Sequence, residues 1–218
     1  KFNLSHVLSG QKKITDIIET GPFNLKVIPA ASGVQHMSEL SAAEQAEIIH
    51  AFGSLSADLD VLIVDTAAGI AGNVVRFARA CQEVMVVVTD EPTSLTDAYA
   101  FIKLLNREHG LYQFNILANM VQSDNQGRQL FKKLSSVTDD YLDVVLNYAG
   151  AIPFDKFLRK AVQKQSAVVK EFPDSLSAKA FDALAQEINH WPVKTKMGGH
   201  LEFFVERMME YESQEIVA

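Results

Sequence analysis

The sequence predicts an α/β fold, a doubly wound and mostly parallel sheet with helices on both faces. Short apolar runs rich in β-branched residues recur along the chain, and the stretches between them carry apolar residues at the helical period. The runs hold few polar side chains, as strands covered on both faces do. Each run ends in turn-forming or polar residues, which places loops at one edge of the sheet. The expected strands are 25–28, 60–65, 84–89, 114–117 and 144–152.

Composition limits the class of protein. The 218 residues allow one large domain or two small ones, and 48% hydrophobic content fills a substantial core. A net charge of −7 argues against a surface that follows nucleic-acid phosphates, so no direct nucleic-acid partner is expected. Cys81 is the one cysteine and cannot form an internal disulfide, which favours a packing thiol in a reducing cytosol. No apolar run reaches the length of about 18 residues typical of a membrane span.

The elements before residue 60 follow from local signals. Two short helices are expected within 4–19, because Gly10 interrupts the apolar pattern. The strand 25–28 closes with a loop of proline and small residues. Ser41 and Glu44 form a capping box, and the helix after them presents Ile48, Ile49 and Phe52 as its buried stripe.

The stretch 60–70 carries the first candidate site. The apolar run 61–64 suits a strand buried on both faces, and Asp65 follows at its carboxyl end. A carboxylate there suits Mg²⁺ bound through a water, and Gly69 after it suits a terminal phosphate. The alternative is a strand that stops at a turn-forming aspartate.

The later elements alternate regularly. A helix is expected over 73–81, and a second after the strand 84–89, with a capping box from Ser94 to Asp97 and an end at Gly110. A helix over 126–137 follows the strand 114–117, and two helices follow the strand 144–152.

Polar residues at the strand ends define the second candidate site. Asn119 follows one strand, and the triplet Pro153-Phe154-Asp155 follows another. A single asparagine at a strand end is usually a turn residue. Together with Asp65, however, these side chains supply the donors and acceptors that read an adenine edge.

Taken in order, these motifs resemble the MinD/ParA family of deviant P-loop ATPases over roughly 25–190, and more narrowly the flagellar number regulators of the FlhG or FleN type. The resemblance implies ATP or ADP with Mg²⁺ as ligands and a homodimer that ATP closes. It assigns Asp65 to the Mg²⁺ shell as the catalytic carboxylate and Gly69 to the γ-phosphate. Asn119, Pro153 and Asp155 are assigned to the adenine.

The resemblance also implies partners and a location. The implied partners are the GTPase FlhF, components of the flagellar C-ring and the master flagellar transcription activator (FlrA or FleQ). The implied location is the cytoplasm, with peripheral contact to the inner membrane at the cell pole. The alternative from another class is a non-catalytic protein-interaction module made from part of such an ATPase.

One departure from the family pattern is large. The family's lysine-containing, glycine-rich phosphate loop does not occur in these 218 residues, and 29–33, the nearest substitute, has one glycine and no lysine. We therefore expect a portion of a longer protein that does not hydrolyse ATP by itself. We also expect a gap in the sheet beside Asp65, where the strand preceding the phosphate loop would lie; the alternative to a portion of a longer protein is that a partner fills this gap.

The sequence divides into an ATPase-like domain, 1–197, and a tail, 198–218, that begins with a glycine hinge. The tail has an amphipathic pattern, with glutamates opposite an apolar face made of Leu201, Phe204, Val205 and Met208. By resemblance this face contacts the membrane, although the acidity of the tail equally favours docking on the protein's own body or on a partner. A basic helical face, Lys156, Arg159, Lys160 and Lys164, is interpreted as solvated.

Overall fold

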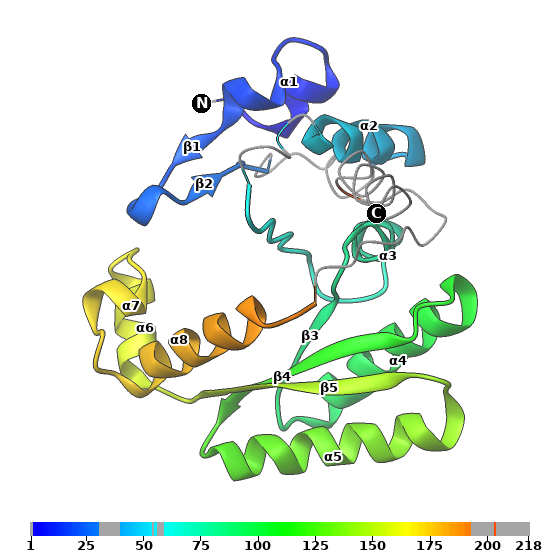
Figure 1. Cartoon of the computed structure of the whole chain (residues 1–218), viewed down its shortest axis with the longest axis vertical. Helices are drawn as coiled ribbons and strands as arrows, with labels where there is room; N and C mark the ends of the chain where they lie inside the picture. The colour runs from blue at the N-terminus through cyan, green and yellow to red at the C-terminus, as the bar shows by residue number, and fades with distance from the viewer. Residues whose placement is uncertain (1, 31–39, 54, 56–58, 193–202, 204–218) are drawn as a thin grey trace, which may run out of the picture. The chain divides into compact units, whose positions relative to one another are not determined.

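The computed structural model describes residues 2–30, 40–53, 55, 59–192 and 203. Contacts divide the chain into two units, one formed by 1–82 with 194–218 and the other by 83–193. Figure 1 labels the helices and strands of both units. None of the helices within the described ranges is long and apolar enough to cross a membrane.

The first unit is built from short elements. Helix α1 (Leu4–Leu8) and a 3₁₀ turn, η1 (Ile14–Ile17), confirm the two short helices expected within 4–19. Strands β1 (Glu19–Thr20) and β2 (Lys26–Val27) form an antiparallel hairpin around a second 3₁₀ turn, η2 (Pro22–Asn24). Two longer helices follow, α2 (Ala42–Gly53) and α3 (Gly72–Ala80).

Helix α2 begins as the sequence predicts. The backbone N–H of Ser41 donates to Glu44 Oε2 at 2.9 Å, and the N–H of Glu44 donates to Ser41 Oγ at 3.3 Å. This reciprocal capping box satisfies two amide groups at the helix start. The helix then buries Ile48, Ile49 and Phe52 in the core of the first unit.

The segment 61–64 is not a strand, and this prediction was wrong. Val61 is 57% exposed and Ile63 is 81% exposed, whereas Leu62 and Val64 pack against the core of the unit. The segment therefore covers that core with one face only. No strand among the described residues pairs with it, and an extended run without a ladder partner does not become part of a sheet.

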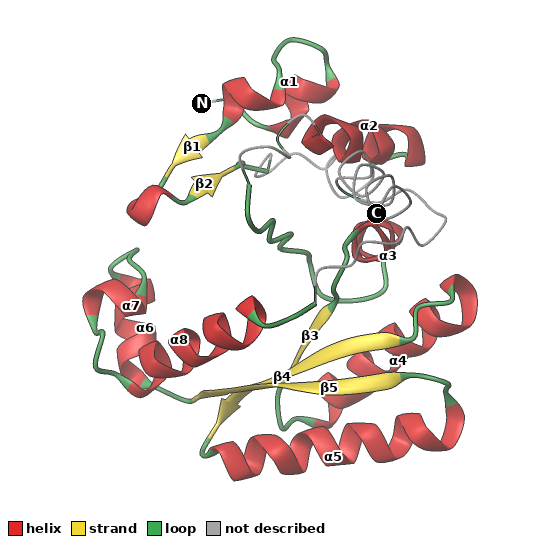
Figure 2. Cartoon of the chain, in the orientation of Figure 1, coloured by secondary structure: helices red, strands yellow, loops and turns green. Residues whose placement is uncertain are grey.

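The second unit confirms the α/β prediction. Strands β3 (Met85–Val88), β4 (Gln113–Val121) and β5 (Val145–Pro153) form a parallel sheet in the order β3-β4-β5. Helices α4 (Pro92–His109) and α5 (Asp124–Tyr141) make the two crossovers and lie on one face, and α8 (Leu176–Asn189) lies on the other (Figure 2). Two short helices, α6 (Lys156–Gln163) and α7 (Val168–Glu171), follow β5.

The start of α4 differs from the prediction of a capping box at Ser94. The helix begins at Pro92, and Ser94 Oγ instead accepts the backbone N–H of Thr89 at 3.0 Å. Proline fits the first helical turn because its missing N–H has no intrahelical partner there. The predicted end is confirmed, since Gly110 adopts the left-handed conformation with φ 71°.

Close packing holds α5 on the sheet at Gly127. A Cβ atom at this position would meet Tyr148 Oη at 2.5 Å and the Ala151 Cβ at 2.9 Å. Only glycine lets the helix approach β5 to this distance without displacing these neighbours. The N-terminal end of α5 is thereby fixed next to the carboxyl half of β5.

Candidate functional site

The carboxyl edge of the sheet in the second unit gathers the predicted strand-end residues. Asn119 of β4 pairs in register with Ile152 of β5, and Val121 pairs with Pro153. The N–H of Phe154 donates to the Val121 carbonyl at 2.8 Å and extends this pairing. The structure therefore places Asn119 beside the triplet that begins at Pro153, as parallel strand pairing requires.

A bulge shapes β4 next to this edge. Met120 has no register partner between Asn119 and Val121, and its φ of 56° lies in the left-handed region. Such a bulge changes the direction of the side chains around it and often lies beside a functional site. Asn119 Oδ1 accepts the N–H of Met120 at 2.9 Å, and Asn119 Nδ2 has no hydrogen-bond partner within the described ranges. An amide donor is thus available at the edge.

Asp155 joins two helix starts. Its Oδ1 accepts the N–H of Phe157 at 2.8 Å, and its Oδ2 accepts both the N–H and the hydroxyl of Ser177 at 3.0 and 2.8 Å. The backbone hydrogen bond from Ser177 is the main reason that the pKa of Asp155 lies below its usual value, and the Phe157 N–H lowers it further. The side chain is buried, is the N-cap of α6, and supports the cap of α8 by accepting an N–H from its first turn, where Ser175 is the N-cap. Its oxygens are therefore occupied within the fold.

Asp90 connects the loops that follow β3 and β4. Its carboxylate accepts hydrogen bonds from Lys133 Nζ at 2.9 Å and Gln126 Nε2 at 3.0 Å. The hydrogen bond from Lys133 contributes most to lowering the pKa of Asp90. Gln126 Oε1 in turn accepts the N–H of Gln122 at 2.6 Å. These bonds hold the loop at 122–123 and the first turn of α5 in place beside the edge.

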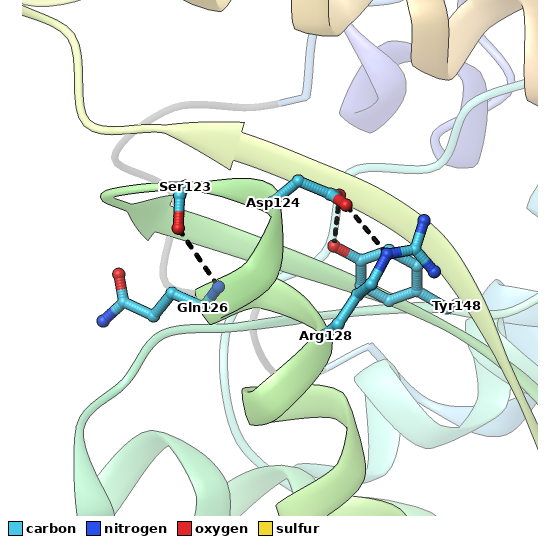
Figure 3. Close-up of polar contacts among 5 residues, drawn as sticks. All are labelled: Ser123, Asp124, Gln126, Arg128 and Tyr148. Atoms are coloured by element: carbon cyan, nitrogen blue, oxygen red, sulfur yellow. Dashed lines mark hydrogen bonds and ion pairs between the residues drawn. The ribbon is translucent and has the colours of Figure 1, made fainter.

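A polar cluster at the start of α5 was not predicted from the sequence (Figure 3). Asp124 accepts the Tyr148 hydroxyl at 3.0 Å and Arg128 Nε at 2.8 Å, and the Arg128 guanidinium lies 4.9 Å from the centre of the Tyr148 ring. Burial, followed by the hydrogen bond to Asp124, raises the pKa of Tyr148 to about 12. Ser123 caps the helix by accepting the Gln126 N–H at 3.3 Å. The i,i+4 spacing of Asp124 and Arg128 was the one signal in the sequence.

The remaining predicted residues belong to the first unit. Asp65 and Gly69 lie in an exposed segment before α3, and Gly69 has φ 104° with open space around it. In the part of the chain that the structure describes, no three histidine, cysteine, aspartate or glutamate side chains gather to hold a metal. The apolar tail face, Leu201, Phe204, Val205 and Met208, lies outside the described residues.

One tail residue is described, and it packs on the first unit. Phe203 is 3% exposed, and its N–H donates to the Ala80 carbonyl at 2.9 Å. Its ring packs edge-on against Phe52 with centroids 5.4 Å apart and lies parallel to the Phe77 ring at 6.4 Å. Phe203 is therefore part of the core that α2 and α3 build.

Solved structures share this fold. The cell division ATPase MinD of Pyrococcus furiosus matches with a TM-score of 0.69 and 23% identity, over 87% of this chain and 76% of that one. The septum site-determining protein MinD of Pyrococcus horikoshii, solved with Mg-ADP, matches with a TM-score of 0.64 and 24% identity, over 87% and 74% of the two chains. The architecture is that of the MinD-like P-loop ATPases.

Sequence relatives define the family more narrowly. The antiactivator FleN of Pseudomonas aeruginosa is 53% identical over 211 residues, which cover 97% of this chain and 75% of FleN. The flagellum site-determining protein YlxH of Helicobacter pylori is 32% identical over 185 residues, which cover 84% of this chain and 62% of YlxH. No protein-family model matches the chain. The chain belongs to the FleN family of MinD/ParA-type ATPases.

Proposed function

We propose that this chain belongs to an ATP-dependent switch that regulates flagellar number and placement. The observation that carries the proposal is the 53% identity to an antiactivator over nearly the whole chain. The site-determining relative supports the same process. The sheet edge at Asn119 and Pro153 supports this proposal, because ligands of open α/β sheets bind beyond the carboxyl ends of the strands.

In this proposal the adenine binds along β4 and β5. The Asn119 amide provides a donor for a ring nitrogen and an acceptor for the exocyclic amine. The backbone at Pro153 and Asp155 supplies the second side of the base site. Because the Asp155 carboxylate caps α6 and α8, its contribution to the base is a backbone contact rather than a side-chain contact.

Asp65 and Gly69 are proposed for the phosphate end of the nucleotide. Asp65 holds Mg²⁺ through a water, and Gly69 approaches the γ-phosphate with its backbone N–H. Hydrolysis requires a lysine-containing phosphate loop, which these 218 residues do not contain. We therefore propose that ATP hydrolysis in this family depends on such a loop. These 218 residues by themselves should not hydrolyse ATP.

The switch acts through protein partners in this proposal. ATP closes a homodimer, and the closed state contacts the GTPase FlhF, the flagellar C-ring and the flagellar transcription activator (FlrA or FleQ). The name antiactivator, given to the relative from Pseudomonas aeruginosa, supports the last of these. The proposed location is the cytoplasm near the pole, with peripheral contact to the inner membrane.

Base selectivity tests the nucleotide site directly. Fluorescent mant-ADP and mant-GDP are titrated into the full chain with Mg²⁺, and ADP is expected to bind more tightly. Asn119→Ala should reduce the ADP preference by up to about tenfold, because a hydrogen bond contributes about 0.5–1.5 kcal/mol. Asn125→Ala, an exposed change on α5, is the matched control and should leave the preference unchanged. Equal binding of both nucleotides by the unaltered chain would contradict the proposed base site.

The alternative function is a non-catalytic protein-interaction module. Exposed apolar side chains on α5, Val137 and Tyr141, favour it, since such groups are common at interfaces. A chain that binds no nucleotide but retains binding to the transcription activator would support this alternative.

A further inference from the structure

Basic residues are concentrated in one segment of an otherwise acidic chain. Residues 154–180 contain six lysines and arginines and three aspartates and glutamates, whereas the rest of the chain contains 14 basic and 24 acidic residues. The segment covers α6, α7 and the start of α8, all within the second unit. A local positive surface therefore exists despite the net charge of −7.

Aromatic rings position the lysines of this segment. Lys156 Nζ and Lys160 Nζ lie 5.4 and 5.5 Å from the centre of the Phe157 ring. Lys164 Nζ lies 5.2 Å from the centre of the Phe172 ring, and the two rings contact each other with centroids 5.1 Å apart. The two neighbouring rings therefore hold three lysine cations close to one another, two at Phe157 and one at Phe172.

Most of this charge is uncompensated. Lys164 pairs with Glu171 at 3.0 Å. Lys156, Arg159 and Lys160 have no carboxylate within ion-pair distance in the part of the chain that the structure describes. All three are exposed and fall on one side of α6 at helical spacing. We call this surface, with Lys164 included, the α6–α7 face.

Large apolar side chains are exposed beside these cations. Val162 on α6 is 66% exposed and Leu176 at the start of α8 is 68% exposed. Phe154, next to the start of α6, is also exposed. Asp155 caps α6 and α8 together, so Phe154 and Leu176 both flank that shared capping point. Exposed apolar groups among unpaired cations are costly in water and indicate an interaction surface.

We propose that the α6–α7 face docks on an anionic phospholipid surface. Lysines surrounded by aliphatic and aromatic side chains match the two components of such a surface, because the cations meet headgroup phosphates and the apolar tips enter the acyl boundary. A nucleic acid would use the cations but not the aliphatic side chains, and both phenylalanine rings are already covered by lysines. This contact is separate from the apolar tail face.

Vesicle sedimentation of the full chain without nucleotide tests the inference. Vesicles of phosphatidylcholine with phosphatidylglycerol are expected to bind the chain, and vesicles of phosphatidylcholine alone are not. Each basic residue near an anionic surface contributes about fivefold to binding, so Lys156→Gln with Lys160→Gln should weaken it by about 25-fold. Lys103→Gln with Lys132→Gln makes the same charge change at exposed lysines of α4 and α5 and should have no effect.

Two further variants separate the contributions. Val162→Asn should weaken vesicle binding several-fold without altering the charge, because it removes an apolar tip. Phe204→Ser with Val205→Ser alters the tail and should leave nucleotide-free binding unchanged. The inference is overturned if the tail variant alone removes binding, or if the two lysine pairs have equal effects. It is also overturned if a peptide of sequence 202–216 binds the chain and the anionic vesicles do not, which would identify an acidic protein segment as the occupant.

Discussion

Replacing Phe203 by alanine tests how the tail is attached to the first unit. The ring is almost fully buried between Phe52 and Phe77, and core Phe→Ala changes cost about 3–5 kcal/mol. The backbone hydrogen bond to Ala80 alone contributes only about 1 kcal/mol, so residue 203 should detach in the variant. The variant should retain the sheet of the second unit, which Phe203 does not build.

Cys81 reports this detachment. It packs against the cluster that contains Phe203, and burial raises the pKa of its thiol to about 11 from an ordinary value of 9.0. At pH 8 the thiolate fraction should therefore be about one in a thousand when buried and about one in ten when exposed. Because the thiolate is the reacting form, Phe203→Ala should speed alkylation of Cys81 by up to about 100-fold.

A matched control distinguishes local detachment from general loosening. Phe131→Ala removes a ring that packs on Tyr148 at 5.5 Å in the second unit, and the Cys81 rate should stay the same. Iodoacetamide labelling followed by mass spectrometry measures both rates, with circular dichroism to verify folding. An unchanged Cys81 rate in a folded Phe203→Ala variant would refute the reasoning, and so would an equal increase in the Phe131→Ala control.

Two more predictions follow from packing and capping. Gly127→Ala should lower the free energy of unfolding by about 1–3 kcal/mol in urea melts, because the new Cβ meets the Tyr148 hydroxyl and Ala151; adding Tyr148→Phe should restore part of this loss. Asp155→Asn should weaken the joint cap of α6 and α8. Since the pKa of Asp155 is lowered in the folded state, its stabilisation is present above the unfolded value of 3.8 and is lost as pH falls through the folded pKa. Acid titration of the variant should show a smaller loss of stability over that interval, and identical acid curves would contradict the capping role.

Several elements could be predicted from local sequence because their causes are local. The valine-rich run of β3 and the glycine after α4 each specify their own conformation, and both are found where expected. The Ser41 capping box spans four residues and forms as predicted. At the start of α4 two local signals conflict, namely a proline that favours the first helical turn and a capping box that begins at Ser94. The helix begins at Pro92, so Ser94 lies inside the helix and is not its N-cap.

Other features depend on partners far along the chain. The run 61–64 has the composition of a buried strand, but a strand needs a neighbour to accept its hydrogen bonds, and none of the described residues provides one. Asp155 was assigned from its motif to the adenine, yet its carboxylate bonds Ser177, 22 positions later. A sequence motif identifies a residue but does not show which hydrogen bonds its side chain already makes within the fold.

The sequence by itself determined the fold class, the family, and the strand ends that gather Asn119 and Pro153 at one edge. The fold class and the strand ends follow from hydrophobic period and residue order, whereas the family follows from the resemblance of the motifs to known proteins. Only the tertiary structure decided that Phe203 lies in the core of the first unit and that Lys156 and Lys160 both lie over the Phe157 ring. Burial and unpaired charge depend on which distant segments meet, and that is fixed by packing rather than by local pattern.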